Sequence, residues 1–247
     1  MSKHSLIIGG TRGIGRELVR IFSEQGHAVS VIGKRPPSEE DRQRKNVSFW
    51  AVDVTDKPGV NTTLAEILAQ NGRLDYLVFL QRFKSDGDKW LGEIQTSLTA
   101  TKEIIEALAA HFSDSDDRSI VAVSSIADEF IADGQPAGYH VGKAGLWHLV
   151  RYFAVMLASK GIRVNCVSPC TFVKQENQAF YSQNEKLRNL FKLVIPLGRM
   201  GNAVDSANVI AFLCSPQSSF VTGQKITVDG GVSLLSQESL ARKIAGL

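Results

Sequence analysis

Short apolar runs alternate with longer amphipathic runs along the whole 247-residue chain. The apolar runs have the length of buried strands, and the intervening runs have the spacing of helices. The expected strands are 6–8, 28–32, 48–52, 74–80, 119–123, 162–167 and 225–228. This alternation is typical of a parallel sheet that is covered by helices on both faces. We therefore predict an α/β fold of the doubly wound Rossmann type.

Helices are expected in most of the intervals between these strands. The expected helices are 17–22, 59–70, 90–112, 139–160 and 202–213, with a frayed helix in the tail. The segment 171–195 has no readable motif, and we expect it to be irregular. No linker is long enough to divide the chain and no repeat is present, so residues 1–247 are expected to form one domain.

Composition excludes several classes of function. The net charge of +3 is too mild to indicate a nucleic-acid or membrane surface. No apolar run approaches the roughly 20 residues that span a bilayer, and the N-terminus enters a strand without room for a signal peptide. The three cysteines are an odd number without the pairing of a metal site, so we expect free thiols, no bound metal and a cytoplasmic protein.

A glycine-rich turn follows the first strand and precedes the first helix. Its glycines, Gly9, Gly13 and Gly15, have the spacing G-x-x-x-G-x-G. Glycines allow close approach of a pyrophosphate, and the N-terminus of the following helix attracts its charge. We predict that this loop binds a dinucleotide, through Gly9, Thr11, Arg12, Gly13, Ile14 and Gly15. A glycine turn without a ligand is the alternative.

The end of the second strand indicates which dinucleotide is bound. An NAD site usually places an acid there to hold the ribose 2′-hydroxyl. This chain has Gly33 followed by Lys34 and Arg35, which would favour a 2′-phosphate that Arg12 could also reach. The sequence therefore predicts NADP(H), with solvated loop cations as the alternative.

Tyr139 and Lys143 are four residues apart in a predicted helix, so they should share one face. A phenol has a pKa of about 10, and a nearby ammonium favours its ionised form. Such a pair suits general acid–base chemistry near neutral pH. An ordinary pair on a helix face is the alternative.

Together these motifs resemble the short-chain dehydrogenase/reductase family over almost the whole chain, and most of all its NADPH-dependent 3-oxoacyl and carbonyl reductases. The motifs are Gly9-x-x-x-Gly13-x-Gly15, Asp53-Val54, Ser125, Tyr139-x-x-x-Lys143, Asn165-x-Val167-x-Pro169 and Val228-Asp229-Gly230-Gly231. The resemblance implies an NADPH-dependent oxidoreductase that reduces a ketone or aldehyde to an alcohol. It also implies a homotetramer, or at least a homodimer.

The resemblance also implies roles for individual residues. Ser125 would hold the substrate carbonyl oxygen, and Tyr139 would protonate it. Lys143 would lower the Tyr139 pKa and bind the nicotinamide ribose. Asp53 and Val54 would contact the adenine. Pro169 would also line the cofactor site.

Several positions depart from the family pattern. The usual N-N-A-G after the fourth strand is Phe79-Leu80-Gln81-Arg82, where Arg82 could crowd the cofactor or bind a phosphate or a substrate acid. Ser97 replaces the asparagine that supports a water relay to the lysine. Cys170 replaces a glycine, and Lys174 stands where a threonine often meets the carboxamide. A regulatory, non-catalytic nucleotide-binding protein on a degenerate fold is therefore the alternative function.

Two further expectations concern the helices. His140 should face away from Tyr139, because it lies about 100° around the helix. Apolar surface for subunit contact is expected from Ile104, Ile105, Leu108, Trp147 and Met156.

Overall fold

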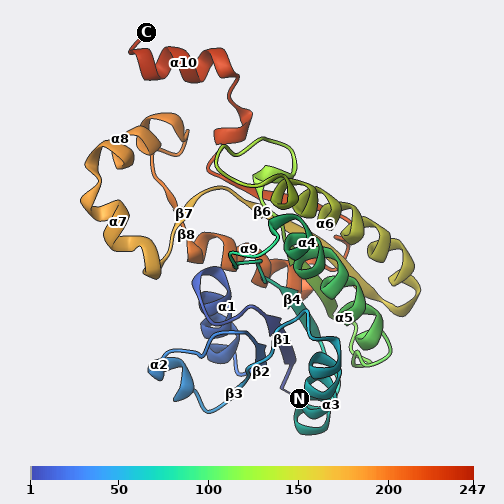
Figure 1. The fold of residues 1–247 in the computed structure, drawn as a ribbon. Coiled ribbons are helices and arrows are strands. Elements are labelled where there is room, and N and C mark those ends of the chain that lie inside the picture. Colours follow the sequence, from blue (N-terminus) through green and yellow to red (C-terminus); the bar gives the residue numbers. More distant parts are fainter. Residues whose placement is uncertain (1) are drawn as a thin grey trace.

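Seven parallel strands form the central sheet of the computed structural model, which describes residues 2–247 (Figure 1). Their order across the sheet is β3-β2-β1-β4-β5-β6-β9. The strands are β1 His4–Ile8, β2 Ala28–Ile32, β3 Val47–Trp50, β4 Tyr76–Phe79, β5 Arg118–Val123, β6 Ile162–Pro169 and β9 Lys225–Val228. The predicted α/β fold of the Rossmann type is confirmed.

The central strands are buried and mostly apolar because helices cover both faces of the sheet. Every residue of β1 and of β6 is buried. A half-exposed sheet would instead alternate apolar and polar residues. Continuous runs such as Leu6-Ile7-Ile8 are therefore readable as strands in the sequence alone.

One face of the sheet is covered by α1 Gly13–Glu24 and α9 Ala203–Cys214, which pack together with Leu18 and Ile210 in one core cluster (Figure 1). The other face is covered by α3 Lys57–Asn71, α5 Ala100–Leu108 and α6 Ala137–Met156. The short α2, Glu39–Arg42, lies beside β3.

The long helix expected over residues 90–112 is not continuous. It consists of α4 Lys89–Ile94, a π-helical turn Gln95–Thr99 and α5. No Pro or Gly marks this turn within residues 95–99, so local sequence does not show it. π-Turns inside α-helices occur frequently at functional sites, and this one carries Ser97.

The segment 171–195 is also more regular than expected. It contains β7 Phe172–Val173, which pairs with β8 Gly201–Asn202, followed by α7 Gln178–Gln183 and α8 Glu185–Val194. The Asn184 side chain accepts a hydrogen bond from Leu187 N at 3.0 Å and caps α8. The tail helix α10, Gln237–Ala245, packs against α8, and both stand away from the sheet (Figure 1).

The prediction of an apolar surface for subunit contact on the long helices is largely wrong. Ile104, Ile105 and Leu108 are buried in the core, because α5 turns them toward the sheet. Trp147 packs partly against the same core, and Met156 is exposed. No helix among residues 2–247 is both long enough and apolar enough to cross a membrane.

Candidate active site

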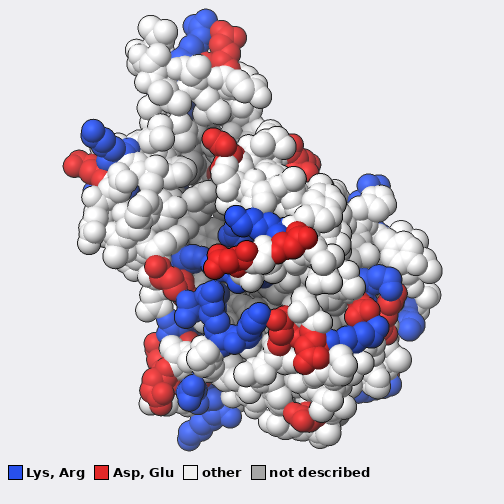
Figure 2. Space-filling view, viewed as in Figure 1, with Lys and Arg blue, Asp and Glu red and all other residues white. Residues whose placement is uncertain are grey.

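A cavity of about 750 Å³ opens at the carboxyl ends of the strands. It lies between the neighbouring strands β1 and β4, where the order of the strands in the sheet reverses. Doubly wound sheets bind their ligands at this point. Its volume lies in the range of ligand sites. Lysine and arginine side chains surround the hollow on this face (Figure 2).

The glycine loop forms one wall of the cavity with little space for any side chain. Gly9 has a φ of +88°, and a Cβ there would lie 2.9 Å from Gln81 N. A Cβ on Gly15 would collide with the backbone of Gly9 and Gly10. Helix α1 begins at Gly13 with no acidic residue in its first turn and no side-chain cap from Arg12. Its first N–H groups are thus free to meet a phosphate.

Basic residues dominate the rest of the lining. The cations are Arg12, Lys34, Arg35, Arg82, Lys84 and Lys174, and the acids are Asp53 and Glu176. Burial, together with the charges of Lys174, Arg82, Arg35 and Arg12, lowers the pKa of Lys84. The cavity therefore suits a ligand that carries several negative charges.

Asp53 lies at the adenine end that the family motif predicts, and it pairs with one of these cations. Lys34 Nζ lies 2.7 Å from Asp53 Oδ2, and Thr55 donates its N–H and its hydroxyl to Oδ1 at 3.1 and 2.9 Å. Burial opposes ionisation of the carboxyl, but hydrogen bonds from Lys34 and Thr55 outweigh it and lower the Asp53 pKa. Lys34 is therefore partly neutralised, whereas Arg12 and Arg35 have no ion pair within residues 2–247.

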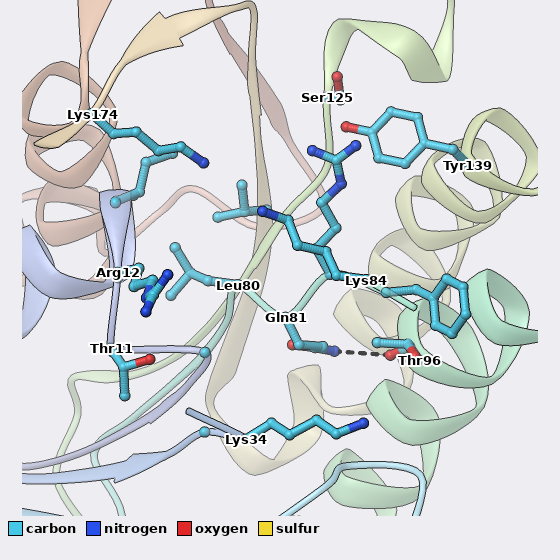
Figure 3. A pocket seen from close by; sticks show the side chains of 18 of the residues that line it. Thr11, Arg12, Lys34, Leu80, Gln81, Lys84, Thr96, Ser125, Tyr139 and Lys174 are labelled. Atoms are coloured by element: carbon cyan, nitrogen blue, oxygen red, sulfur yellow. Dashed lines mark hydrogen bonds between the residues drawn. The ribbon is translucent and has the colours of Figure 1, made fainter. Parts of the chain in front are cut away.

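Ser125, Tyr139 and Lys143 meet at the opposite end of the cavity. Ser125 follows β5, and its hydroxyl accepts a hydrogen bond from Ala127 N at 3.2 Å. The hydroxyls of Ser125 and Tyr139 lie close together at the cavity wall (Figure 3). Lys143, one turn further along α6, places its Nζ 5.8 Å from the centre of the Tyr139 ring. The structure thus brings together the three residues that the family motif predicts.

Lys143 is held beneath this surface rather than in it. The residue is buried, and its Nζ donates a 2.9 Å hydrogen bond to the carbonyl oxygen of Val123. Burial lowers the Lys143 pKa to about 8, and the Glu93 carboxylate is the strongest charge that opposes this shift.

Ser97 reaches the same region from the π-helical turn. It is buried, and its Oγ lies 3.8 Å from the place where a Cβ on Gly142 would stand. Its hydroxyl donates to Glu93 Oε2 at 3.4 Å. Burial raises the pKa of Glu93, against the charges of Lys143 and Arg82. Sequence reasoning missed Glu93, although its spacing of four from Ser97 on a helix was a usable sign.

Gln81 and Arg82 occupy the positions where the family has small residues. Gln81 Nε2 donates to Thr96 O at 3.3 Å and to Thr101 Oγ1 at 2.8 Å, the former drawn in Figure 3. Arg82 places its guanidinium carbon 4.8 Å from the centre of the Tyr139 ring and donates to Gln135 Oε1 at 2.7 Å. Arg82 therefore lies beside the Ser125–Tyr139 end of the cavity.

The other predicted cofactor residues, Thr11, Ile14, Val54 and Pro169, also line the cavity. Lys174 lies over the glycine loop. Its Cδ is 3.5 Å from the position that a Cβ atom would take if Gly13 carried a side chain.

Burial raises the pKa of the Cys170 thiol to about 11, which leaves it protonated and unreactive at neutral pH. His140 faces away from the cavity, with Nδ1 3.0 Å from the carbonyl oxygen of Ala127.

A buried ion pair that sequence reasoning missed lies behind Ser125. Lys225 Nζ, on β9, lies 3.1 Å from Asp128 Oδ1 and 2.7 Å from Glu129 Oε1. The hydroxyl of Ser124 donates to Asp128 Oδ2 at 3.1 Å. These contacts tie the turn after Ser125 to the last strand of the sheet. The two partners are about a hundred residues apart, so only the fold reveals the pair.

Comparison with known proteins gives this site its family. The family model described as enoyl-(acyl carrier protein) reductase matches residues 9–233. The 3-oxoacyl-[acyl-carrier-protein] reductase FabG of Staphylococcus aureus is 32% identical over 248 residues, which are 94% of this chain and 98% of the relative. The chain belongs to the short-chain dehydrogenase/reductase family.

Solved structures of the short-chain dehydrogenase/reductase fold agree with this assignment. A short-chain dehydrogenase from Leptospira borgpetersenii with bound NAD⁺ is 27% identical, with a TM-score of 0.80, over 94% of this chain and 93% of that one. ElxO with NADP bound is 26% identical, with a TM-score of 0.81, over 95% of this chain and all of the other. Short-chain dehydrogenases/reductases are oxidoreductases that use a nicotinamide cofactor, so this chain is an oxidoreductase of that family. The glycine wall and the basic lining fit such a cofactor.

Proposed function

We propose that this protein is an NADPH-dependent reductase of a small ketone or aldehyde, with Tyr139 as the proton donor. The observation that carries the proposal is the convergence of Ser125, Tyr139 and Lys143 at one end of a cavity whose other end is a basic glycine loop. A protein that only binds nucleotide has no chemical need for these three side chains.

The residues that would hold the cofactor lie along the cavity in order. Gly9, Gly13 and Gly15 would leave room for the pyrophosphate, and the N-terminus of α1 would face it. Asp53 and Val54 would contact the adenine, and Pro169 would border the nicotinamide. When bound, NADPH would supply the hydride that attacks the carbonyl carbon.

The preference for NADPH rests on two cations, Arg12 in the glycine loop and Arg35 after β2. Arg12 and Arg35 are exposed, and both line the cavity. Gly33 leaves no acid to repel a 2′-phosphate. Solved relatives carry either NAD⁺ or NADP, so family membership alone does not choose between them.

The chain's own residues account for the proton. Ser125 would donate a hydrogen bond to the carbonyl oxygen of the substrate, and Tyr139 would transfer its hydroxyl proton to that oxygen as the hydride arrives at carbon. The products are the alcohol, NADP⁺ and a tyrosinate. The Lys143 ammonium would stabilise that tyrosinate until a proton from solvent restores it.

Ser97 and Glu93 offer the route for that returning proton. Both are buried between α4 and α6, and Glu93 carries a raised pKa that eases its protonation. A hydroxyl both donates and accepts, so Ser97 with a bound water could replace an asparagine-mediated link to Lys143.

We also propose a cytoplasmic homodimer or homotetramer. The three cysteines are free thiols, which suits a reducing compartment. Tyr152, Val155 and Met156 form an exposed apolar strip on α6 that a second copy would cover. Light scattering coupled to gel filtration tests this; a monomer of 27.0 kDa at micromolar concentration would contradict it.

The direct test of function is NADPH oxidation, followed at the cofactor's absorbance band, against a panel of ketones and aldehydes. Consumption that requires both protein and carbonyl supports the reductase. Tight NADPH binding without consumption across the panel would support the alternative, a non-catalytic nucleotide-binding protein, which the unusual Phe79–Arg82 segment favours.

A further inference from the structure

Arg82 is an unpaired cation at the reacting end of the cavity. Its side chain is exposed, and no aspartate or glutamate in the described part of the chain lies within ion-pair distance of it. One of its N–H groups donates a hydrogen bond to Gln135 Oε1 at 2.7 Å. A guanidinium has five N–H donors in a fixed fork, so an edge remains for a second partner.

Two contacts hold this guanidinium in place. It lies over the Tyr139 ring at 4.8 Å, within the range of a cation–π interaction, and it donates to Gln135 in the turn that precedes α6. Both partners belong to the segment that carries the proposed proton donor. The charge is therefore positioned relative to Tyr139 rather than left as a mobile surface arginine.

Arg82 lies away from the part of the cavity where the phosphates of the cofactor are expected. The glycine loop and the N-terminus of α1 lie at the other side of the cavity, and Lys174 already covers Gly13 there. Arg35 follows β2, where a 2′-phosphate would lie, and Arg12 in the glycine loop also lines the cavity. The cofactor's charges thus have partners of their own, and Arg82 is left for another anion.

Lys84 adds a further positive charge to the cavity. It lines the cavity, and Figure 3 shows its side chain extending into the space between Tyr139 and Arg12. After burial, the charges that lower the pKa of Lys84 are those of Lys174 first and Arg82 second, so its own positive charge adds to that of Arg82 in the cavity.

We propose that Arg82, supported by Lys84, forms an anion subsite beside Tyr139, and that the substrate is a carbonyl compound with a carboxylate or another oxyanion close to its carbonyl group. The proposal rests on the reductase function proposed above. With the anion on Arg82, the carbonyl oxygen reaches the hydroxyls of Ser125 and Tyr139 in one orientation.

The kinetic test compares an oxo acid with its methyl ester, which has the same carbonyl without the charge. We expect wild type to prefer the acid by about 10- to 100-fold in kcat/KM, the range of a charge-assisted hydrogen bond. Arg82→Gln should abolish this preference mainly by raising KM for the acid, and Arg82→Lys should restore part of it. Arg73→Gln, at an exposed arginine paired with Asp114, is the matched control and should behave as wild type.

A binding measurement keeps the proposal testable without turnover. Calorimetry with oxamate, in the presence of NADP⁺, should show binding to wild type and at least tenfold weaker binding to Arg82→Gln, while both proteins bind NADPH within about threefold of each other. Equal affinity of both proteins for oxamate, equal kcat/KM for acid and ester in wild type, or a large loss of NADPH affinity in Arg82→Gln would each overturn the subsite. A protein that binds oxamate through Arg82 but reduces no carbonyl would instead refute the reductase function alone.

Discussion

The ammonium of Lys143 donates a 2.9 Å hydrogen bond to the carbonyl oxygen of Val123, two residues before Ser125. This bond joins helix α6, which carries Tyr139, to the end of β5, which leads into Ser125. One buried amine thus ties the segment of Tyr139 to the segment of Ser125. Its burial also lowers its pKa to about 8, close to neutral pH.

A pH profile follows from that shift. Lys143 carries its charge below about pH 8 and loses it above. Its folded pKa is lower than the ordinary value, so the loss begins well before that of a free lysine. We expect kcat for carbonyl reduction to fall as the pH rises through about 8, because the ammonium that stabilises tyrosinate disappears. A rate that stays constant from pH 7 to about 10 would contradict this role for the amine.

Substitution of Ser97 tests the proton route. Ser97→Ala should lower kcat by about tenfold if a water can fill the place of the hydroxyl, which is less than the roughly 10²–10⁴-fold effect of losing a general acid. Ser97→Asn should be tolerated or should raise the rate. Glu93→Gln should lower kcat and move the fall in kcat to lower pH, because the Glu93 carboxylate is the strongest charge that opposes the lowering of the Lys143 pKa. If all three variants match wild type in single-turnover kinetics, protons do not pass through this pair.

The cofactor preference can be assigned to two arginines. We expect NADPH to bind about ten- to a few hundred-fold more tightly than NADH, because charge-assisted hydrogen bonds to a 2′-phosphate contribute roughly 1.5–3 kcal/mol each before solvent screening. Arg12→Ser and Arg35→Ser should each weaken NADPH binding while NADH affinity changes little. Fluorescence titration with both cofactors measures the difference. Equal affinities in wild type would contradict the assignment.

The ion pair behind Ser125 should matter for stability. Lys225→Met leaves the Asp128 carboxylate, whose side chain is only 1% exposed, without its cation. Breaking a buried pair in this way costs about 3–5 kcal/mol. We expect that loss in urea unfolding, together with a lower kcat because the turn after Ser125 shifts.

The double variant Asp128→Asn/Lys225→Met serves as its control. It should recover part of the lost stability, since no unpaired charge remains buried. If Lys225→Met unfolds like wild type, the pair does not contribute to stability.

The strands of the central sheet and the shared helix face of Tyr139 and Lys143 could be predicted from the sequence for a physical reason, whereas Ser125 was implied by the family resemblance. A parallel strand buried on both faces appears as a continuous apolar run, and residues four apart on a helix share a face whatever surrounds them. These are local properties. They require no knowledge of which segments meet in space.

The features that were missed depend on contacts between distant segments. The π-helical turn at residues 95–99 and the burial of Glu93 arise where α4 packs against α6. The Asp128–Lys225 pair joins a turn to a strand nearly a hundred residues away. Helices α7 and α8 lie in the segment that was expected to be irregular, and they pack against each other through two half-buried aromatic residues, Tyr181 and Phe191. The π-helical turn and the Asp128–Lys225 pair leave no periodic trace in the local sequence, whereas Leu187, Leu190, Phe191 and Val194 of α8 do have helical spacing.

The most direct measurement is the rate of NADPH oxidation by wild type and by Tyr139→Phe with the best carbonyl of the panel, alongside NADPH affinity for both proteins. The phenylalanine variant keeps the ring beneath Arg82 and loses only the hydroxyl. We predict a fall in kcat of at least roughly 10²–10⁴-fold, the range for a lost general acid, with NADPH binding nearly intact. Unchanged carbonyl reduction by Tyr139→Phe would contradict the mechanism proposed for this protein.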